Sequence, residues 1–411
     1  NSKKSIFTAM KKAVFRLTLA LWAILFVSCN TKSEEYIDPR GTDYAGSESC
    51  IQCHKVQSEM AFKSSHFKAT APAILGNVSG DFDSKNHTFI YDKDTKLVME
   101  KEGDSLYQVL YKNGKETARY KFEIVFGTKH AQTSVYWKNN NTYELPVSFY
   151  HSINNWATSP GFPAEKPYFD RMVVKDCYSC HSSNISSKTV DQSSADRNFM
   201  SMEVEDIINK KTIVYGIDCE RCHGPAKKHV EFHLKNPNVK VAYSITSFKT
   251  LNRQQKLDAC ALCHAGNDGM KLKSRFEFKP GDNLSEYFRE TKSITDTANF
   301  DVHGNQYRLM AQSKCFNSQK MDCITCHNPH ENASKNMASY SKICMSCHQG
   351  LKHNETTLKT MPEKLLASNC VECHMPKKAS GAIKFQLSNS KQLSEYILRT
   401  HKIGIYPTNK K

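Results

Sequence analysis

The feature that most constrains this chain is a pentad, Cys-x-x-Cys-His, that occurs seven times along its 411 residues. The pentads, numbered motifs 1 to 7 in chain order, are Cys50-Cys53-His54, Cys177-Cys180-His181, Cys219-Cys222-His223, Cys260-Cys263-His264, Cys323-Cys326-His327, Cys344-Cys347-His348 and Cys370-Cys373-His374. Chance at these Cys and His frequencies would produce roughly 0.03 such pentads, and the pattern is the attachment signature of c-type haem. We therefore expect seven covalently bound haem c groups and a multihaem cytochrome c.

The spacing has a chemical reason. Two thiols add to the two vinyl groups of one porphyrin, and the next residue turns its imidazole onto the iron as the proximal ligand. Zinc is the alternative, because paired Cys-x-x-Cys units form tetrahedral sites, but zinc does not require a His directly after every second Cys. The motif cysteines are thus predicted to bind the cofactor, and the motif histidines to bind its iron. No Cys-x-x-Cys-Lys variant occurs.

The amino terminus predicts export. Lys11 and Lys12 precede an apolar run over 13–27, which has the length of a signal-peptide core, and Cys29 follows shortly after it. Residues 26–29, Phe-Val-Ser-Cys, look like a lipobox, so we expect lipid attachment at Cys29. An uncleaved anchor helix is the alternative, but the run is short for a bilayer span. We expect an exported, membrane-anchored lipoprotein that faces the periplasm or lies on the outer cell surface.

Net charge gives little reason to expect a nucleic-acid partner. The chain carries +16, and removal of residues 1–28, which hold five basic residues and no acid, leaves +11. Seven haems would add roughly −7 when oxidised and about −14 when reduced, because each brings two propionates. Lys and Arg are therefore interpreted as compensating propionates. The expected partners are other redox proteins, namely quinol-linked or soluble cytochromes, and the membrane through Cys29.

The motifs are spread unevenly, since about 120 residues separate motif 1 from motif 2. The expected division is a lipoprotein-type signal peptide at 1–28, a polar tether at 29–45, a first haem module at 46–84, a β-rich, haem-poor insertion at 85–170 and a six-haem module at 171–411. We expect an α+β fold: a haem-packed, mainly helical and irregular multihaem cytochrome with an antiparallel β-insertion after the first haem.

Local patterns locate the expected elements. Strands are predicted at 88–91, 96–99, 106–111 and 120–126. Asn113-Gly114 is a strong hairpin signal between two of them. Helices are predicted at 225–236, 253–264 and 390–400, and a polar loop at 182–194.

Ten histidines lie outside the motifs and are candidates for the sixth, distal position on iron. Those expected to bind iron are His66, His130, His229, His303, His330, His353 and His401. His330 follows proximal His327 by three residues and is too constrained to bind the same iron, so it is expected to serve a neighbouring one. His229 and His233 share a helix face, so one of them is expected to be spare.

Several segments resemble a known group. They are GSESCIQCH at 46–54 followed by Ser65-His66, GIDCERCHGP at 216–225, MDCITCHNPH at 321–330, CVECHMP at 370–376 and FKPGD at 278–282. The chain resembles the multihaem cytochromes related to the tetrahaem cytochrome of ammonia oxidisers and, more distantly, to hydroxylamine oxidoreductase. The resemblance covers most of residues 44–405. It implies close-packed haems, with His66, His229, His330 and His401 as distal ligands, and His130 matches it less securely.

Three functions remain open at this point, of which a haem-based sensor or structural subunit is the least favoured. The chain is predicted to carry electrons between redox partners outside the cytoplasm, and no catalytic residue is assigned. The alternative is an oxidoreductase that acts on a small nitrogen or sulfur compound at one five-coordinate haem. Aromatic residues gather in the haem-poor interval at Tyr136, Trp137, Tyr143, Tyr150 and Trp156. The favoured interpretation of this cluster is an aromatic core that packs against the haem of motif 1 or motif 2, and a substrate pocket is the alternative.

The lipobox interpretation predicts that Cys29→Ala releases the protein from membranes, because the acyl chains attached to Cys29 would supply most of the membrane affinity. Fractionation of cells that express the natural and variant chains measures this. Continued membrane association of the variant would point instead to an uncleaved anchor or to docking on a partner.

Overall fold

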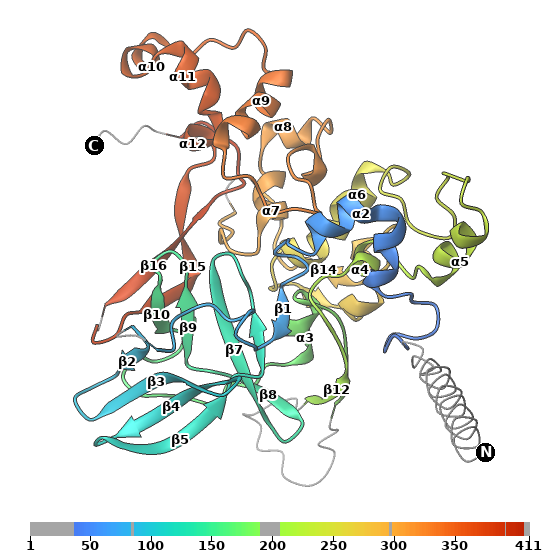
Figure 1. Ribbon diagram of the computed structural model, residues 1–411. Helices are drawn as coiled ribbons and strands as arrows, with labels where there is room; N and C mark the ends of the chain where they lie inside the picture. Colours follow the sequence, from blue (N-terminus) through green and yellow to red (C-terminus); the bar gives the residue numbers. More distant parts are fainter. Residues whose placement is uncertain (1–36, 84–85, 190–205, 296–297, 391, 407–411) are drawn as a thin grey trace, which may run out of the picture. The chain divides into compact units, whose positions relative to one another are not determined.

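A computed structural model describes residues 37–83, 86–189, 206–295, 298–390 and 392–406 (Figure 1). The residues from Pro39 onward form one compact unit. It combines two antiparallel sheets, three two-stranded ribbons and a series of short helices. The predicted signal peptide, lipobox and Cys29 lie outside the described residues, and the predicted domain boundaries remain predictions.

A four-stranded sheet follows motif 1 in the chain. Its strands, in the order β2-β3-β4-β5, are β2 (Thr88–Ile90), β3 (Thr95–Glu102), β4 (Ser105–Lys112) and β5 (Lys115–Lys121). Asn113 and Gly114 join β4 to β5 with φ angles of 50° and 75°, the left-handed conformation that this hairpin turn requires. The predicted strands at 88–91, 96–99 and 106–111 and the predicted hairpin are confirmed.

A second sheet has six strands, in the order β1-β6-β7-β9-β10 with β8 paired to β7. The strands are β1 (Thr70–Pro72), β6 (Ile124–Phe126), β7 (Ala131–Lys138), β8 (Asn141–Glu144), β9 (Val147–Tyr150) and β10 (Asn155–Thr158). The prediction of one strand at 120–126 is wrong, because the chain changes sheets there. Phe122 N donates to Leu106 O of β4, whereas Glu123 N donates to Val135 O of β7.

The two sheets share one apolar core. Its most buried members are Phe89, Leu97, Met99, Leu106, Phe122, Leu145, Val147 and Trp156. Phe82 packs edge-to-face on both Phe122 and Trp156, an arrangement that the ring quadrupoles favour. Tyr136 also belongs to this core, while Tyr150 packs in a second cluster with Phe385 and Tyr396. Tyr136, Tyr150 and Trp156 are therefore core residues, and the expected packing of the aromatic cluster against a haem stays a prediction.

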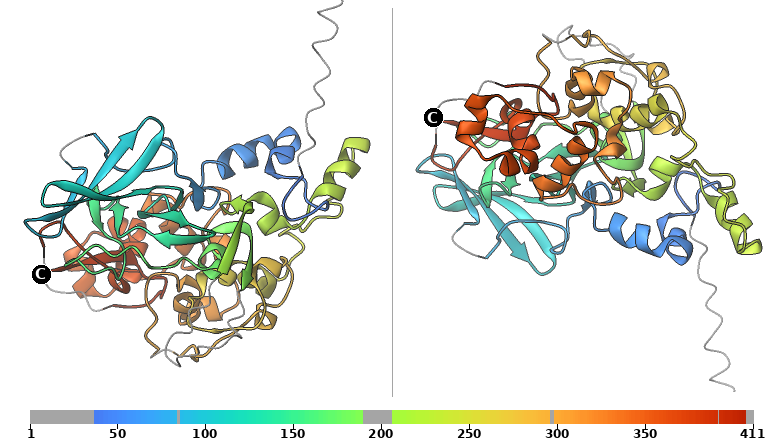
Figure 2. Two further views of the ribbon diagram at one scale, coloured as in Figure 1. Left: turned by 90° about the horizontal axis from the view of Figure 1, so that it is seen from below. Right: turned by 90° about the horizontal axis from the view of Figure 1, so that it is seen from above.

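The short helices of the described structure are α2 (Ile51–Ala61), α3 (Lys175–Ser179), α4 (Cys219–His223), α5 (Lys227–Lys235), α6 (Arg253–His264), α7 (Gln306–Ala311), α8 (Lys314–Asn317), α9 (Met337–Cys347), α10 (Glu355–Thr360), α11 (Glu363–Ser368) and α12 (Cys370–His374). Helices α2, α3, α4, α6, α9 and α12 carry residues of motifs 1, 2, 3, 4, 6 and 7. Motif 5 begins a single 3₁₀ turn, Cys323–Thr325. The predicted helices at 225–236 and 253–264 are confirmed as α5 and α6. Helices α2 and α5 lie next to each other in every view (Figures 1 and 2).

Side-chain caps fix where some motif helices begin. The carboxylate of Asp218 accepts from Arg221 N at the start of α4, and Asp322 does the same for Thr325 N at motif 5. An N-cap side chain satisfies a backbone N–H that the first helical turn leaves unpaired. Since each cap directly precedes a motif, the two motif cysteines fall on the turn that it starts.

Two further predicted elements are wrong. The segment 390–400 is not a helix but forms β16 (Leu393–Arg399), which pairs with β15 (Lys377–Gln386), because Tyr396 packs against Tyr150. The predicted polar loop at 182–194 is wrong over its described part, which forms β11 (Ser182–Thr189) paired with β12 (Asp206–Tyr215).

The α+β class is confirmed, but the expectation of a mainly helical fold is wrong. Tertiary contacts override weak local propensity in polar strands such as β11. There the backbone ladder and the buried residues Ser182, Ser183 and Ile185 supply the stabilisation.

In the described part of the chain, no helix is both long enough and apolar enough to cross a bilayer.

Burial of Glu144 on β8 predicts a pH-dependent stability. Removal from water raises the pKa of Glu144 to about 7, although Arg171 Nη1 donates to its carboxylate over 3.3 Å. The folded protein then holds a proton that the unfolded chain releases, so stability falls as pH rises from about 4.5 to about 7. Glu144→Gln removes this loss. Between pH 5 and pH 8, the free energy of unfolding of the variant should therefore rise by about 2–3 kcal/mol relative to that of the natural chain.

Denaturant unfolding of the holoprotein, followed by far-UV circular dichroism at both pH values, measures that difference. The matched control is Glu231→Gln, at an exposed position on α5. Parallel pH profiles for the natural chain and Glu144→Gln would contradict the assignment.

Candidate metal centre

Imidazole rings from distant parts of the chain face each other in pairs. In five pairs, one ring belongs to a motif and the other does not. The pairs and their ring-centre distances are His54–His229 at 6.3 Å, His264–His66 at 6.1 Å, His223–His330 at 6.1 Å, His327–His401 at 6.3 Å and His374–His353 at 6.5 Å. The rings are nearly parallel in the His223 pair, with an interplanar angle of 3°, and nearly perpendicular in the His264 pair, at 74°.

This distance has a physical meaning. Two imidazoles that bind one metal from opposite sides have ring centres about 6.3 Å apart, because each metal–nitrogen bond is roughly 2.0–2.1 Å and each ring centre lies about 1.1 Å behind its nitrogen. Direct stacking of aromatic rings spans a much wider range of distances. The five pairs lie within a few tenths of an ångström of the metal-bridged value, so the spacing between the rings fits one iron.

Hydrogen bonds orient several of these rings. Nδ1 of His223 donates to Thr246 O over 2.9 Å, and Nδ1 of His229 donates to Tyr243 O over 3.0 Å. Nδ1 of His374 donates to Gly404 O over 2.8 Å, while His66 Nδ1 and Pro329 O are 3.4 Å apart. His264 differs, because its Nδ1 donates to a side chain, Gln306 Oε1, over 3.2 Å. A proton held at Nδ1 leaves Nε2 unprotonated, as an iron ligand requires.

Two motif histidines have no such facing ring among the described residues: His181 of motif 2 and His348 of motif 6. Burial lowers the pKa of His181, and the nearby charge of His303 lowers it further. Desolvation also lowers the pKa of His303, whose backbone N donates to Asp301 Oδ1. Among the described residues, His303 is the non-motif histidine whose charge acts on His181 of motif 2.

The remaining candidates lie elsewhere. The ring of His130 contacts Tyr396, with ring centres 6.2 Å apart, and its pKa is lowered first by burial and then by charges that include His303. Nδ1 of His87 donates to Phe82 O. On α5, His233 packs against His229 at 4.6 Å and does not face a motif ring in the described structure.

Cysteines from different motifs also lie close together. Cys50 of motif 1 lies beside Cys219 of motif 3, Cys263 of motif 4 beside Cys180 of motif 2, and Cys260 of motif 4 beside Cys323 of motif 5, so that each neighbour shifts the pKa of the other. These contacts bring motifs 1 and 3 together and place motif 4 beside both motif 2 and motif 5.

The other motifs are linked by the chain around them. The ring of His66, which faces motif 4, donates to Pro329 O. His330, which directly follows Pro329, faces motif 3. Ser341 on α9 accepts from Cys370 N, which joins the helices of motifs 6 and 7. The resulting spatial order is 1, 3, 4, 5, with motif 2 beside motif 4 and motifs 6 and 7 adjacent.

A buried ionic cluster joins motif 3 to the segment before motif 1. Arg40 donates two hydrogen bonds to Asp218, of 3.0 and 2.7 Å, and one of 3.1 Å to Glu220. Glu220, inside motif 3, also accepts from the backbone N of Ala45 and Gly46. Burial raises the pKa of Glu220, but these donors favour its charged form. The cluster fixes the chain before motif 1 against motif 3.

Other buried cations lack full partners within the described residues. The Arg308 side chain is completely buried and pairs with Asp268, yet its Nη2 has no hydrogen-bond acceptor. Arg221 Nη2 donates to Arg275 O and Ser179 O, whereas Arg221 Nε has no hydrogen-bond acceptor among the described residues. Unpaired buried donors are costly, so these positions favour an additional anionic or accepting group. Haem propionates have that chemistry, and the residues around the motifs therefore fit haem.

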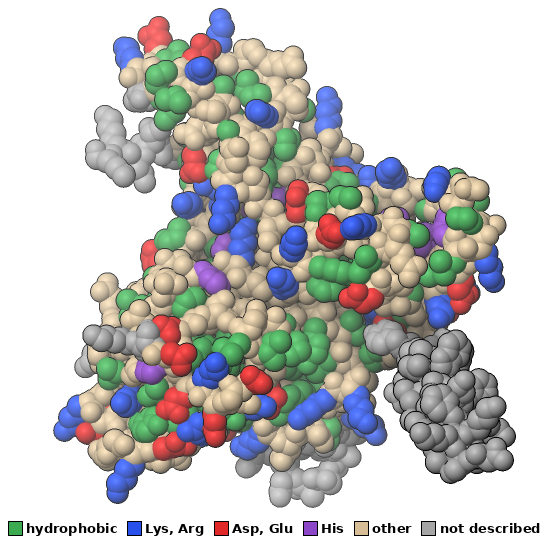
Figure 3. All heavy atoms as spheres, viewed as in Figure 1, with side chains coloured by type: hydrophobic (Ala, Val, Ile, Leu, Met, Phe, Trp, Pro, Cys, Tyr) green, Lys and Arg blue, Asp and Glu red, His purple; other side chains and the backbone are tan. Residues whose placement is uncertain are grey.

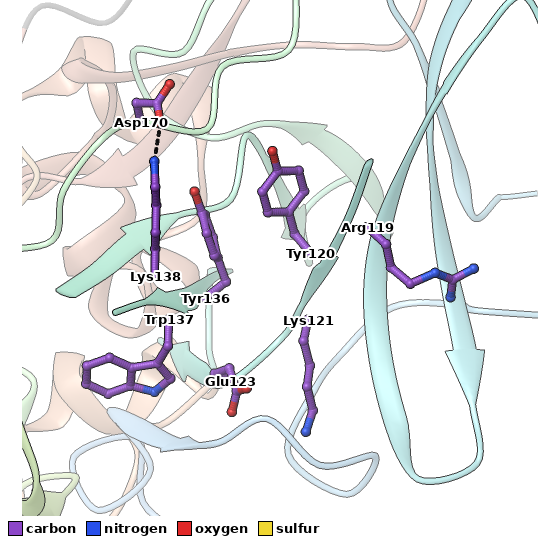
Figure 4. Close-up of a pocket in the computed structure, with 8 residues that line it drawn as sticks. All are labelled: Arg119, Tyr120, Lys121, Glu123, Tyr136, Trp137, Lys138 and Asp170. Atoms are coloured by element: carbon purple, nitrogen blue, oxygen red, sulfur yellow. Dashed lines mark ion pairs between the residues drawn. The ribbon is translucent and has the colours of Figure 1, made fainter. Parts of the chain in front are cut away.

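A separate cavity of about 390 Å³ lies in the β-sheet part (Figure 4). Its walls are Arg119, Tyr120, Lys121, Glu123, Tyr136, Trp137, Lys138 and Asp170. Tyr136 donates to Phe169 O, and Lys138 forms an ion pair of 3.6 Å with Asp170. No motif residue lines it, so this cavity is not part of the histidine arrangement.

Comparison with known proteins identifies the motif class. A family model described as the doubled CXXCH motif matches residues 316–353, which contain motifs 5 and 6. Among solved structures, the chain is similar to the outer cell wall cytochrome OcwA, with a TM-score of 0.49 and 15% identity over 88% of this chain and 80% of that chain. No curated protein sequence matches the chain. The doubled motif and its repetition along the chain support a multihaem c-type cytochrome.

Sequence reasoning missed the residues that orient the rings. Most act through backbone carbonyls, such as those of Tyr243, Thr246 and Gly404, and a carbonyl has no signature in a sequence. Gln306 acts through its side chain but lies forty-two residues from His264. Only the tertiary structure brings these acceptors to the rings.

The ring geometry predicts that His229→Ala and His233→Ala differ, although both residues lie on α5. Loss of His229 removes the ring that faces His54, so one haem equivalent should become high-spin. His233→Ala should keep the low-spin spectrum. Optical and electron paramagnetic resonance spectra of the two ferric proteins measure this. A high-spin signal in the His233 variant alone would reverse the assignment on α5.

Proposed function

We propose that this chain is a heptahaem c-type cytochrome that carries electrons between redox partners outside the cytoplasm. The observation that carries the proposal is the set of five facing imidazole pairs, 6.1 to 6.5 Å apart, each of which includes one motif histidine. Iron held by two imidazoles has no free position for a substrate, and such haems serve electron transfer. No substrate pocket is needed for this function.

The proposed distal ligands follow the geometry. His229 serves motif 1, His330 serves motif 3, His66 serves motif 4, His401 serves motif 5 and His353 serves motif 7. For motif 2 we assign His303, whose charge lies close to His181. His130 stays a candidate from the resemblance, because its ring contacts Tyr396 and no motif histidine in the described structure.

The protein's own residues hold the sites close together. Each bound haem supplies a one-electron couple, whose potential depends on axial ligands, burial and hydrogen bonds. The contacts between Cys50 and Cys219 and between Cys260 and Cys323 set neighbouring motifs side by side. The order 1, 3, 4, 5 forms a continuous series of sites, which is the arrangement that an electron carrier requires.

Location and partners belong to the same proposal. Haem c is attached outside the cytoplasm, and the leader over 1–28 with Cys29 supports a lipoprotein that faces the periplasm or the cell exterior. Quinol-linked or soluble cytochromes are the proposed partners. On the face drawn in Figure 3, Lys and Arg are interspersed with Asp and Glu, which is unlike the continuous basic stripe of nucleic-acid binding proteins. The segments quoted above support membership of the ammonia-oxidiser cytochrome group.

One observation favours a second function. His348 of motif 6 has no facing imidazole among the described residues, whereas five other motif histidines do. A five-coordinate haem at motif 6 would leave a position for a small nitrogen or sulfur compound. The chain would then be an oxidoreductase in which the remaining haems supply or remove electrons.

Spectroscopy of the purified holoprotein separates the two functions. The carrier predicts seven haems per chain, all low-spin, in pyridine haemochrome assay and ferric optical spectra. A high-spin fraction near one-seventh would favour the oxidoreductase instead. His348→Met offers a second readout, because it changes the proximal ligand of motif 6 alone and identifies its contribution to the spectrum. Fewer than seven haems would contradict the heptahaem proposal.

A further inference from the structure

The orienting hydrogen bonds are of two kinds. The rings of His66, His223, His229 and His374 lie against backbone carbonyls, which any residue at the acceptor position would provide. His264 of motif 4 instead donates to the side-chain amide oxygen of Gln306 over 3.2 Å. This acceptor depends on the identity of one side chain, so a substitution can strengthen it or remove it.

The surrounding structure holds Gln306 in place. It is the first residue of α7, and the turn before it is fixed because Gly266 N donates to Gly304 O over 2.8 Å. Two residues later, the buried Arg308 pairs with Asp268. Both contacts join α7 to the segment directly after motif 4, so the Gln306 amide and the His264 ring are positioned by the same short stretch of chain.

Motif 4 also occupies the centre of the series. Its cysteines lie beside Cys180 of motif 2 and Cys323 of motif 5. The ring that faces His264 belongs to His66, which donates to Pro329 O, and the residue after Pro329 is His330, which faces motif 3. Three other motifs are therefore its direct neighbours. The redox potential at this position affects transfer toward all of them.

We propose that Gln306 is a positioning residue that sets the reduction potential of the haem at motif 4 by fixing the orientation and basicity of His264. The inference rests on the proposed function, because it requires a haem held by His264 and His66. An acceptor at Nδ1 makes the imidazole a stronger electron donor to iron, which stabilises the ferric state. A carboxylate strengthens this effect, and an apolar side chain abolishes it.

Two variants test the proposal from opposite sides. Gln306→Glu should lower the midpoint potential of one haem, and Gln306→Leu should raise the potential of the same haem, while the other six keep their values. Spectroelectrochemical titration of the holoprotein resolves these waves, and electron paramagnetic resonance follows the ring orientation at the affected site. If Gln306 had a merely structural role, the midpoint potential of this haem would shift in the same direction in both variants.

The matched control is Gln392→Glu, which adds the same charge at an exposed position directly before β16 and should leave all potentials unchanged. The proposal would be overturned if the midpoint potentials stayed unchanged in both Gln306 variants, or if they shifted in the same direction in both. If Gln306→Leu loses a haem, the test rests on Gln306→Glu alone. A lowered midpoint potential in that variant supports the proposal, and an unchanged one contradicts it. A natural chain without seven bis-imidazole haems would instead refute the proposed function, so the two failures are distinguishable.

Discussion

The arrangement of the motif-bearing part depends on the facing imidazoles. Four of the five pairs join segments that are far apart in the sequence, as His54 joins His229 and His327 joins His401. Between the rings lies a gap that suits one iron and its ligand bonds. The apolar clusters around these motifs are small, such as Leu257, Met310 and Phe316 beside motif 4, so side-chain packing alone leaves little to hold the segments together. In the proposed holoprotein, haem supplies the missing apolar surface and the covalent link.

The β-sheets provide the complementary part of the fold, a core that needs no cofactor. They also fix motif 2, because Thr70 on β1 donates to His181 O and accepts from Gly216 N. Gly216 has a φ of 64°, and a side chain there would collide with Phe67 O, so only glycine permits this close approach. The sheet thereby positions motif 2 on one side and the entry to motif 3 on the other.

Electrostatics acts within the motif-bearing part. The net positive charge of the sequence suggested cations that compensate propionates, and the structure places several of them inside the protein. Arg40 pairs with Asp218 and Glu220, whereas Arg221 and Arg308 keep hydrogen-bond donors without acceptors among the described residues. Buried cations raise the potential of nearby redox groups, because they favour the reduced and less positive state. Burial of these groups, more than net charge, is therefore expected to tune the sites.

The sequence by itself determined the chemistry, because a Cys-x-x-Cys-His pentad is a local signal: cysteines and histidine lie on one turn, and their spacing alone defines what they bind. It also determined the hairpin at Asn113-Gly114 and helix α6, whose signals are equally local. The tertiary structure decided which histidine faces which motif, since those partners come from distant segments. It also decided that 390–400 pairs as a strand and that Gln306 reaches His264, because cross-strand pairing and second-shell hydrogen bonds depend on neighbours that a local pattern does not contain.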